Sequence, residues 1–160
     1  MSIESRIPDP EILKANEVRA AEQLRTLGFT AKNGITLKSL KPGSCTCEME
    51  IREDHLNTLG QVHGGILYAL CDTAASLAAA SYGEGGNTVK GDISYLRAVR
   101  GSRMSCTAKV VKYGRHLVFS GTELFDEQGK LCCTGEFIHY QMPQAPGEGN
   151  FGIEPVFGDA

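Results

Sequence analysis

The sequence lacks several features that mark common classes of protein. It has no apolar run long enough to cross a bilayer, because the longest candidate, residues 66–80, is interrupted by Asp72. It lacks a basic excess, with 16 Lys and Arg against 19 Asp and Glu, which argues against a general nucleic-acid binder. Its first six residues lack the basic-then-apolar pattern of a signal peptide. We therefore expect a cytoplasmic protein with no membrane or nucleic-acid partner.

The six cysteines form no CxxC pair and no Cys/His spacing typical of a zinc site. Cys45 and Cys47 alternate with polar residues, which places both on the apolar face of a strand. We therefore expect reduced thiols in the core and no metal site. His116 and His139 have no partner at ligand spacing and are interpreted as surface or strand residues.

Hydrophobic spacing predicts two helices of different character in a chain long enough for one domain. Residues 10–27 carry apolar side chains near helical spacing among charges, which predicts an amphipathic surface helix with Gly28 at its C-cap. From Gly65 to about Tyr82 the chain is apolar almost all round, which is typical of a helix that other elements bury. A polar loop, residues 52–60, precedes this second helix.

The remaining segments alternate as strands and turns. Two strands precede the buried helix, at residues 35–40 and 44–51, with a turn at residues 41–43. Four follow it, at residues 88–96, 104–113, 117–125 and 130–141, and the clearest hairpin signal lies at residues 126–129. One apolar helix between strands is best buried by a curved sheet, so we predict an α+β fold with an antiparallel sheet wrapped around the helix. The domain is expected to span residues 1–142, and a flexible tail residues 143–160.

The segment that joins the polar loop to the buried helix carries the clearest chemistry. Gly64 and Gly65 let the backbone approach a ligand, and their N–H groups lie at the positive end of the helix dipole. Such donors can hold an oxyanion. Asp72, inside the same apolar helix, costs free energy unless it is paired, solvated in a cleft or used. The two features together suggest acyl-transfer chemistry.

Residues 57–72 spell N-x2-G-x2-H-G-G-x6-D, which resembles the hot-dog-fold acyl-CoA thioesterases, especially the phenylacetate-degradation (PaaI-like) group. Residues 92–97 (DISYLR), 114–115 (GR) and 126–131 (DEQGKL) also resemble that group. The resemblance covers roughly residues 35–141 and implies the hot-dog fold. It also implies a homodimer, or a dimer of dimers, whose sites are shared by two subunits.

The resemblance implies roles for individual positions. Gly64, next to Gly65, would donate its N–H to the thioester carbonyl, and Asp72 would be the nucleophile or the general base on water. The other implied catalytic residues are Asn57, which orients thioester or water, His63, which fixes the loop and polarises the carbonyl, Thr88, which holds the attacking water, and Ser76, a helper hydroxyl. Each of these residues also has a structural explanation. The two glycines could permit a tight helix entry, His63 could make a loop hydrogen bond, and Asn57 could be a turn residue. The hydroxyls of Ser76 and Thr88 could satisfy backbone groups.

A length argument supports the shared site. Asp72 follows Gly64 by eight positions, which is roughly 12 Å along one helix. An oxyanion donor should lie ~3 Å from the carbonyl oxygen, and the attacking group ~3–3.5 Å from the carbon. Two antiparallel helices side by side can meet both requirements, whereas one helix cannot easily do so. We therefore expect two equivalent sites per dimer.

Coenzyme A carries phosphates, so basic residues are expected near the cleft. The candidates are Arg97, Arg100, Arg103, Lys90 and Arg115, and a solvated basic turn is the alternative interpretation. The family often has proline after the first of these arginines, where this chain has Ala98. That departure puts the turn geometry, and with it the phosphate ligands, in doubt.

The leading hypothesis is an acyl-CoA thioesterase that releases free acid and CoA from an aromatic or a short- to medium-chain acyl-CoA. It needs no metal or organic cofactor, since coenzyme A is part of the substrate. Tyr68, Leu67 and Leu77 are candidate liners of the acyl pocket, although rows of Leu on this helix also suit the core. The alternatives are a non-catalytic acyl-CoA-binding or regulatory hot-dog protein, and a hydratase, which would want a histidine shortly after Asp72.

Overall fold

The computed structural model of the protein describes residues 7–83 and 85–141. Its helices are α1 (Pro10–Thr26), α2 (Gly28–Asn33) and α3 (Gly64–Ala80), with a 3-10 turn, η2, at Glu53–His55. Its strands are β1 (Thr36–Lys41), β2 (Ser44–Glu50), β3 (Gly86–Tyr95), β4 (Arg103–Tyr113), β5 (Leu117–Asp126) and β6 (Leu131–Gln141). The predicted tail at residues 143–160 lies outside the described residues.

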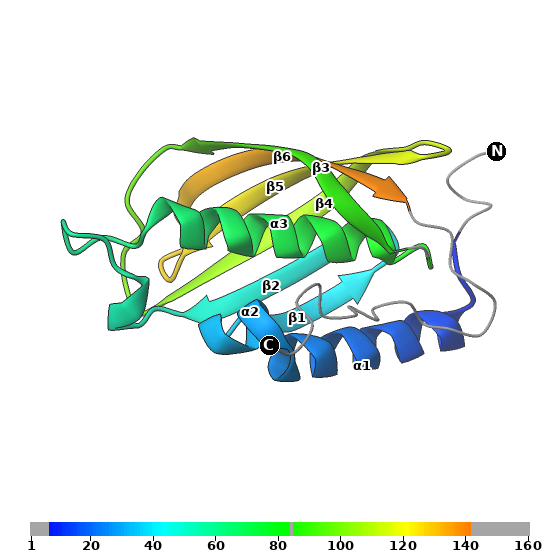
Figure 1. The fold of residues 1–160 in the computed structure, drawn as a ribbon, viewed down its shortest axis with the longest axis horizontal. Coiled ribbons are helices and arrows are strands. Elements are labelled where there is room, and N and C mark those ends of the chain that lie inside the picture. Colours follow the sequence, from blue (N-terminus) through cyan, green and yellow to red (C-terminus); the bar gives the residue numbers. More distant parts are fainter. Residues whose placement is uncertain (1–6, 84, 142–160) are drawn as a thin grey trace, which may run out of the picture.

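The six strands form one antiparallel sheet in the order β1-β2-β4-β5-β6-β3. The sheet curves around α3, which lies along its inner face, while α1 runs beside β1 at the opposite edge from β3 (Figure 1). The predicted α+β architecture, a curved antiparallel sheet around a central helix, is confirmed. β3 follows α3 in the sequence and forms the edge of the sheet beside β6, where it also contacts α3.

The buried helix α3 forms because alanine and leucine dominate its sequence and His63 caps its first turn. Leu70, Cys71, Ala74, Ala75 and Ala78 are fully buried against the sheet. The strands supply the facing layer by alternation, as β4 shows, where every second residue from Met104 to Ala108 is buried. The core therefore lies between α3 and the inner face of the sheet.

The amphipathic helix α1 begins where predicted but ends differently. The Asp9 side chain accepts a hydrogen bond from the Glu11 N–H at 2.8 Å, and Ala20 and Leu24 are buried. Gly28 is not the C-cap, so that prediction is wrong. Leu27 caps α1 in an extended conformation, and Gly28, with φ 50°, starts the short helix α2.

The predicted turns and the predicted burial of the cysteines are also confirmed. At the 126–129 hairpin, Asp126 Oδ1 accepts hydrogen bonds from the N–H groups of Gln128 (3.0 Å) and Lys130 (2.9 Å), while Gly129 has φ 74°. All six cysteines are free and buried, and Cys45 and Cys47 lie on the inner face of β2 as predicted.

Candidate active site

The loop before α3 is held by its own hydrogen bonds. Leu56 and Val62 form an isolated antiparallel bridge, and Asn57 N–H donates to the Gln61 carbonyl at 2.7 Å. Asn57 Oδ1 accepts from the N–H groups of Leu59 (2.9 Å) and Gln61 (3.1 Å). The side-chain oxygen of Asn57 thus stabilises the turn.

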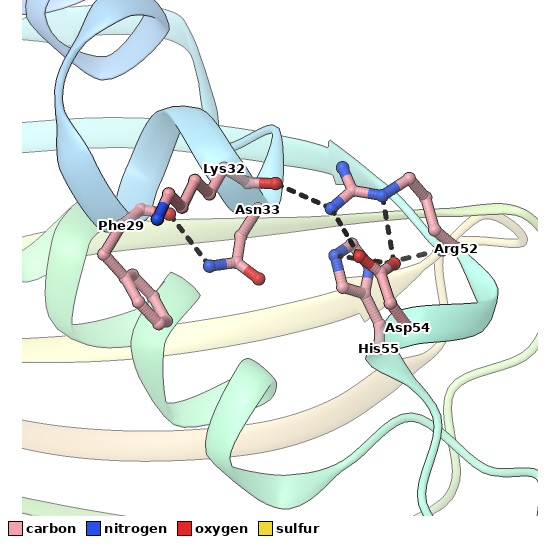
Figure 2. A network of polar contacts seen from close by, with 6 residues as sticks. All are labelled: Phe29, Lys32, Asn33, Arg52, Asp54 and His55. Atoms are coloured by element: carbon pink, nitrogen blue, oxygen red, sulfur yellow. Dashed lines mark hydrogen bonds and ion pairs between the residues drawn. The ribbon is translucent and has the colours of Figure 1, made fainter.

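Arg52 fastens the start of this loop to α2 (Figure 2). Its guanidinium donates to the Lys32 carbonyl at 2.7 Å and to both carboxylate oxygens of Asp54 at 3.1 Å, which holds the pKa of Asp54 below its usual range. Arg52 N–H also donates to Nδ1 of the buried His55, whose carbonyl accepts from His63 N–H at 2.8 Å. Backbone positions on both sides of the loop are therefore fixed before α3 begins.

The start of α3 presents one unused backbone donor. His63 Nδ1 accepts from Gly65 N–H at 2.9 Å, so the neutral ring carries its proton on Nε2. Gly64 N–H donates to no group in the described part of the chain. The Tyr95 hydroxyl donates to the Gly64 carbonyl at 3.0 Å, which ties the end of β3 to the start of α3. Gly64, more than Gly65, thus has the free N–H that an oxyanion would accept.

A hollow of about 420 Å³ opens beside these glycines. Gly64, Gly65, Tyr95 and Arg97 are among the residues that line it, together with Leu67 from α3. Asp72 does not line this hollow. Since Asp72 follows Gly64 by eight positions on α3, about 12 Å of helical rise separates them. The free N–H and the carboxylate of one chain therefore face different places.

A hydroxyl group on the edge strand β3 holds the side chain of Asp72. The Thr88 hydroxyl on β3 donates to Asp72 Oδ1 at 2.8 Å, and the Asp72 side chain is 32% exposed. Ser76 is half-buried one turn further along α3 on the same face, but the hydrogen bond to Asp72 comes from Thr88. Because Thr88 donates its proton to Oδ1, its lone pairs and Asp72 Oδ2 are left to bind a water molecule.

His139 is the residue that the sequence interpretation missed at this site. It is a strand residue, as predicted, but it is only 1% exposed on the inner face of β6, opposite Thr88 in register. Its Nε2 lies 3.8 Å from Asp72 Oδ1. The alternation of β6 could have predicted the burial of His139, because Cys133, Phe137 and His139 are separated by even numbers of residues and so lie on the same, buried face of the strand.

The five basic candidates do not gather at one place. Arg97 lines the hollow next to Gly64 and Gly65. Arg103 contacts Glu50 at 3.2 Å, and Lys90 contacts Asp92 at 2.7 Å. Arg100 is exposed in the connection between β3 and β4, and Arg115 is exposed in the turn between β4 and β5. Arg97 is the basic side chain best placed for a ligand that reaches the Gly64 N–H.

The candidate pocket liners also differ in their surroundings. Tyr68 packs edge-on against Phe137 at 5.3 Å between ring centroids, and its hydroxyl lies against Gly91, where a Cβ would collide with it. Burial first, then the charges of Asp72 and Asp92, raises the pKa of Tyr68. Leu77 instead faces α1, beside Ala20, at the other end of α3. Of the three candidate liners, Tyr68 is thus the one whose pKa responds to the charge of Asp72.

Two negative findings apply to residues 7–83 and 85–141. They contain no group of three or more His, Cys, Asp or Glu side chains arranged to hold a metal ion. None of their helices is long and apolar enough to cross a membrane.

Comparison with known proteins places the chain in a family. A model of the thioesterase superfamily matches residues 59–133. Human acyl-coenzyme A thioesterase 13 is 34% identical over 129 residues, which are 78% of this chain and 88% of that protein. A mutant structure of the phenylacetic acid degradation protein PaaI from Thermus thermophilus is 30% identical, with a TM-score of 0.67 over 71% of this chain and 98% of that one. The PaaI protein of E. coli, 24% identical, shares the fold, with a TM-score of 0.75 over 83% of this chain and 98% of that one.

The chain belongs to the thioesterase superfamily, and its fold is the hot-dog fold. The resemblance stated from the sequence is thereby confirmed.

Proposed function

We propose that the protein is an acyl-CoA thioesterase in which Asp72 is the general base on water. The observation that carries this proposal is a partly exposed carboxylate inside an apolar helix, fixed through one oxygen by the Thr88 hydroxyl at 2.8 Å. Oδ2 and the Thr88 lone pairs can then bind a water molecule, take up its proton and direct its oxygen to the thioester carbon. The 34% identity to an acyl-coenzyme A thioesterase supports this reaction and substrate class.

The carbonyl oxygen of the thioester would accept the Gly64 N–H at the positive end of the α3 dipole. His63 Nε2–H and the Asn57 NH2 group are further donors at the same loop, since His63 Nδ1 and Asn57 Oδ1 are both occupied. The thiolate of CoA leaves, and Arg97, which lines the hollow beside Gly64, would contact its phosphates. The reaction as proposed requires no metal or organic cofactor.

The site is proposed to form between two chains. β3 lies at an edge of the sheet and leaves Val89 61%, Tyr95 53% and Leu96 55% exposed at and just beyond it. An edge strand with exposed apolar side chains can pair with another copy of itself. Pairing along β3 would set two α3 helices side by side and bring Gly64 of one chain toward Asp72 of the other. A dimer of dimers and a cytoplasmic location stay predictions.

The activity is tested by thiol release from a panel of aromatic, short-chain and medium-chain acyl-CoAs, with wild type and Asp72→Asn. We expect release by the wild type on part of the panel and its loss in the variant, because an amide cannot accept the water proton. Unchanged release by Asp72→Asn would remove Asp72 from the mechanism. Binding of acyl-CoA without any release would instead indicate a non-catalytic protein.

The shared site is tested by complementation. Co-expressed Asp72→Asn and Gly64→Pro chains form mixed dimers in which one site has both defects and the other has none. Random pairing then restores about a quarter of wild-type activity from two inactive parents, because half of the dimers are mixed and each has one intact site. If each site lay within one chain, the mixture would regain no activity.

A further inference from the structure

His139 is a buried titratable residue to which the proposed reaction gives no role. Its side chain is 1% exposed, and neither ring nitrogen has a hydrogen-bond partner within the described residues. Leaving a buried polar group without a hydrogen bond costs free energy, so such a group in a folded protein calls for an explanation. Across the strands its register neighbours are Thr88 on β3 and Val118 on β5, neither of which is charged.

The ring faces the same carboxylate oxygen that Thr88 binds. His139 Nε2 lies 3.8 Å from Asp72 Oδ1, and the Thr88 hydroxyl lies 2.8 Å from that oxygen. Oδ1 is therefore approached from β6 and from β3, which are neighbours in the sheet (Figure 1). The hydrogen bond from Thr88 goes to Oδ1 and not to Oδ2, so it distinguishes the two oxygens of the carboxylate.

The protonation state of the ring follows from its surroundings. Burial lowers the pKa of His139, and the nearby Asp72 acts in the opposite direction without reversing the shift. The ring is therefore neutral at pH 7 and carries one proton. Since a lone pair on Nε2 would lie close to a negative charge, the favourable tautomer places the proton on Nε2. The N–H group is then on the ring nitrogen that lies 3.8 Å from Oδ1.

We propose that His139 is a positioning residue, which acts with Thr88 to fix Asp72 Oδ1 and so leaves Oδ2 directed at the attacking water. This inference rests on the proposed function, because it assumes that Asp72 is the general base. It assigns His139 no proton transfer and no contact with substrate. Its effect is to narrow the range of side-chain orientations of Asp72, which affects the chemical step and leaves binding of acyl-CoA unchanged.

The kinetic test compares His139→Leu with His139→Gln, whose side-chain amide can place an N–H near the position of Nε2. We expect His139→Leu to lower kcat about tenfold with KM unchanged, and His139→Gln to recover most of that loss. Val118→Ala is the matched control, because Val118 is a fully buried register neighbour of His139 on β5. It should lower Tm while keeping kcat within about twofold of wild type. Equal kcat in His139→Leu and wild type, or equal losses in the Leu and Gln variants, would overturn the proposal.

A titration of His139 by NMR tests the contact without any turnover. The pKa of the ring should fall further in Asp72→Asn, because the carboxylate raises it in the wild type. An unchanged pKa would overturn the coupling of His139 to Asp72, whatever the kinetics show. If the wild type releases no thiol from any acyl-CoA, the proposed function fails. The titration then still decides whether His139 and Asp72 interact.

Discussion

Replacing Gly64 by proline should remove the proposed oxyanion donor while α3 stays folded. Gly64 is the first residue of α3, where proline is well tolerated, because the N–H at this position makes no helical hydrogen bond. His63 has φ −63° and ψ 135°, an extended conformation that suits the residue before proline. Gly64 itself does not have a positive φ. The substitution therefore deletes an N–H group that donates to no described residue.

The size of the effect follows from what is lost. Removal of one oxyanion-hole donor typically lowers kcat about 10²–10³-fold, which is about 2.7–4 kcal/mol. A side chain at this position also meets the Tyr95 hydroxyl, 3.2 Å from an added Cβ, so either substitution disturbs the hydrogen bond from Tyr95 to the Gly64 carbonyl. Gly64→Ala makes the same Cβ contact and keeps the N–H, so the ratio of the two variants measures the replacement of the N–H by the proline Cδ.

The assay is thiol release under saturating acyl-CoA for wild type, Gly64→Ala and Gly64→Pro, with Tm measured for each. We expect Gly64→Pro to fall about 10²–10³-fold below Gly64→Ala in kcat while α3 and Tm are retained. If the two variants with matching Tm differ by less than about threefold in kcat, the Gly64 N–H does not stabilise the oxyanion.

Two further predictions concern stability. Burial lowers the pKa of both His55 and His139 from 6.5. Below pH 6.5 the unfolded chain therefore binds protons at these two residues that the folded chain does not bind. The free energy of unfolding should be at its full value above pH 6.5 and fall as the pH drops below it. Urea unfolding at about pH 7.5 and 5.5 measures this difference in the free energy of unfolding. A His55→Gln variant should lose less stability between the two pH values than the wild type. Equal stability of the wild type at both pH values would contradict the prediction. Gly91→Ala should destabilise the fold by about 1–3 kcal/mol, because its Cβ would collide with the Tyr68 hydroxyl and the Phe137 ring. Thermal unfolding measures that loss, and an unchanged Tm would show that Tyr68 and Phe137 move aside to make room for the Cβ.

The sequence was sufficient for elements whose signal is local. The apolar period of α3 and the alternation of β4 and β6 each specify an element and the face that it buries. Short elements without a hydrophobic period were not predictable in this way. The six-residue helix α2 has no buried residue, and the sequence interpretation takes Gly28, its first residue, as the end of a helix. Only the extended conformation of Leu27 shows that a second helix begins there.

The two halves of the candidate site also differ in how far the sequence alone predicts them. Its donor half is built from hydrogen bonds between near neighbours in the chain, such as those from Gly65 N–H to His63 and from Gln61 N–H to Asn57. A motif of 16 residues therefore contains nearly all of its geometry. The acid half depends on contacts between distant segments, because Thr88 and His139 reach Asp72 only through the register of β3 with β6. No spacing in the sequence reports that register.

The two halves of the site should therefore respond differently to substitution. A change that shifts β3 against β6 should disturb Asp72 through Thr88 and His139, while the loop bonds that place Gly64 stay intact. Disturbing the loop, for example at Arg52, should move Gly64 and leave Asp72 in place. In a dimer that builds each site from the loop half of one chain and the acid half of the other, defects of the two kinds complement each other in mixed dimers, whereas two defects of the same kind do not. The proposed division of the site between chains thus follows the same boundary as its division between local and long-range contacts, and this boundary lies along α3 between Gly64 and Asp72.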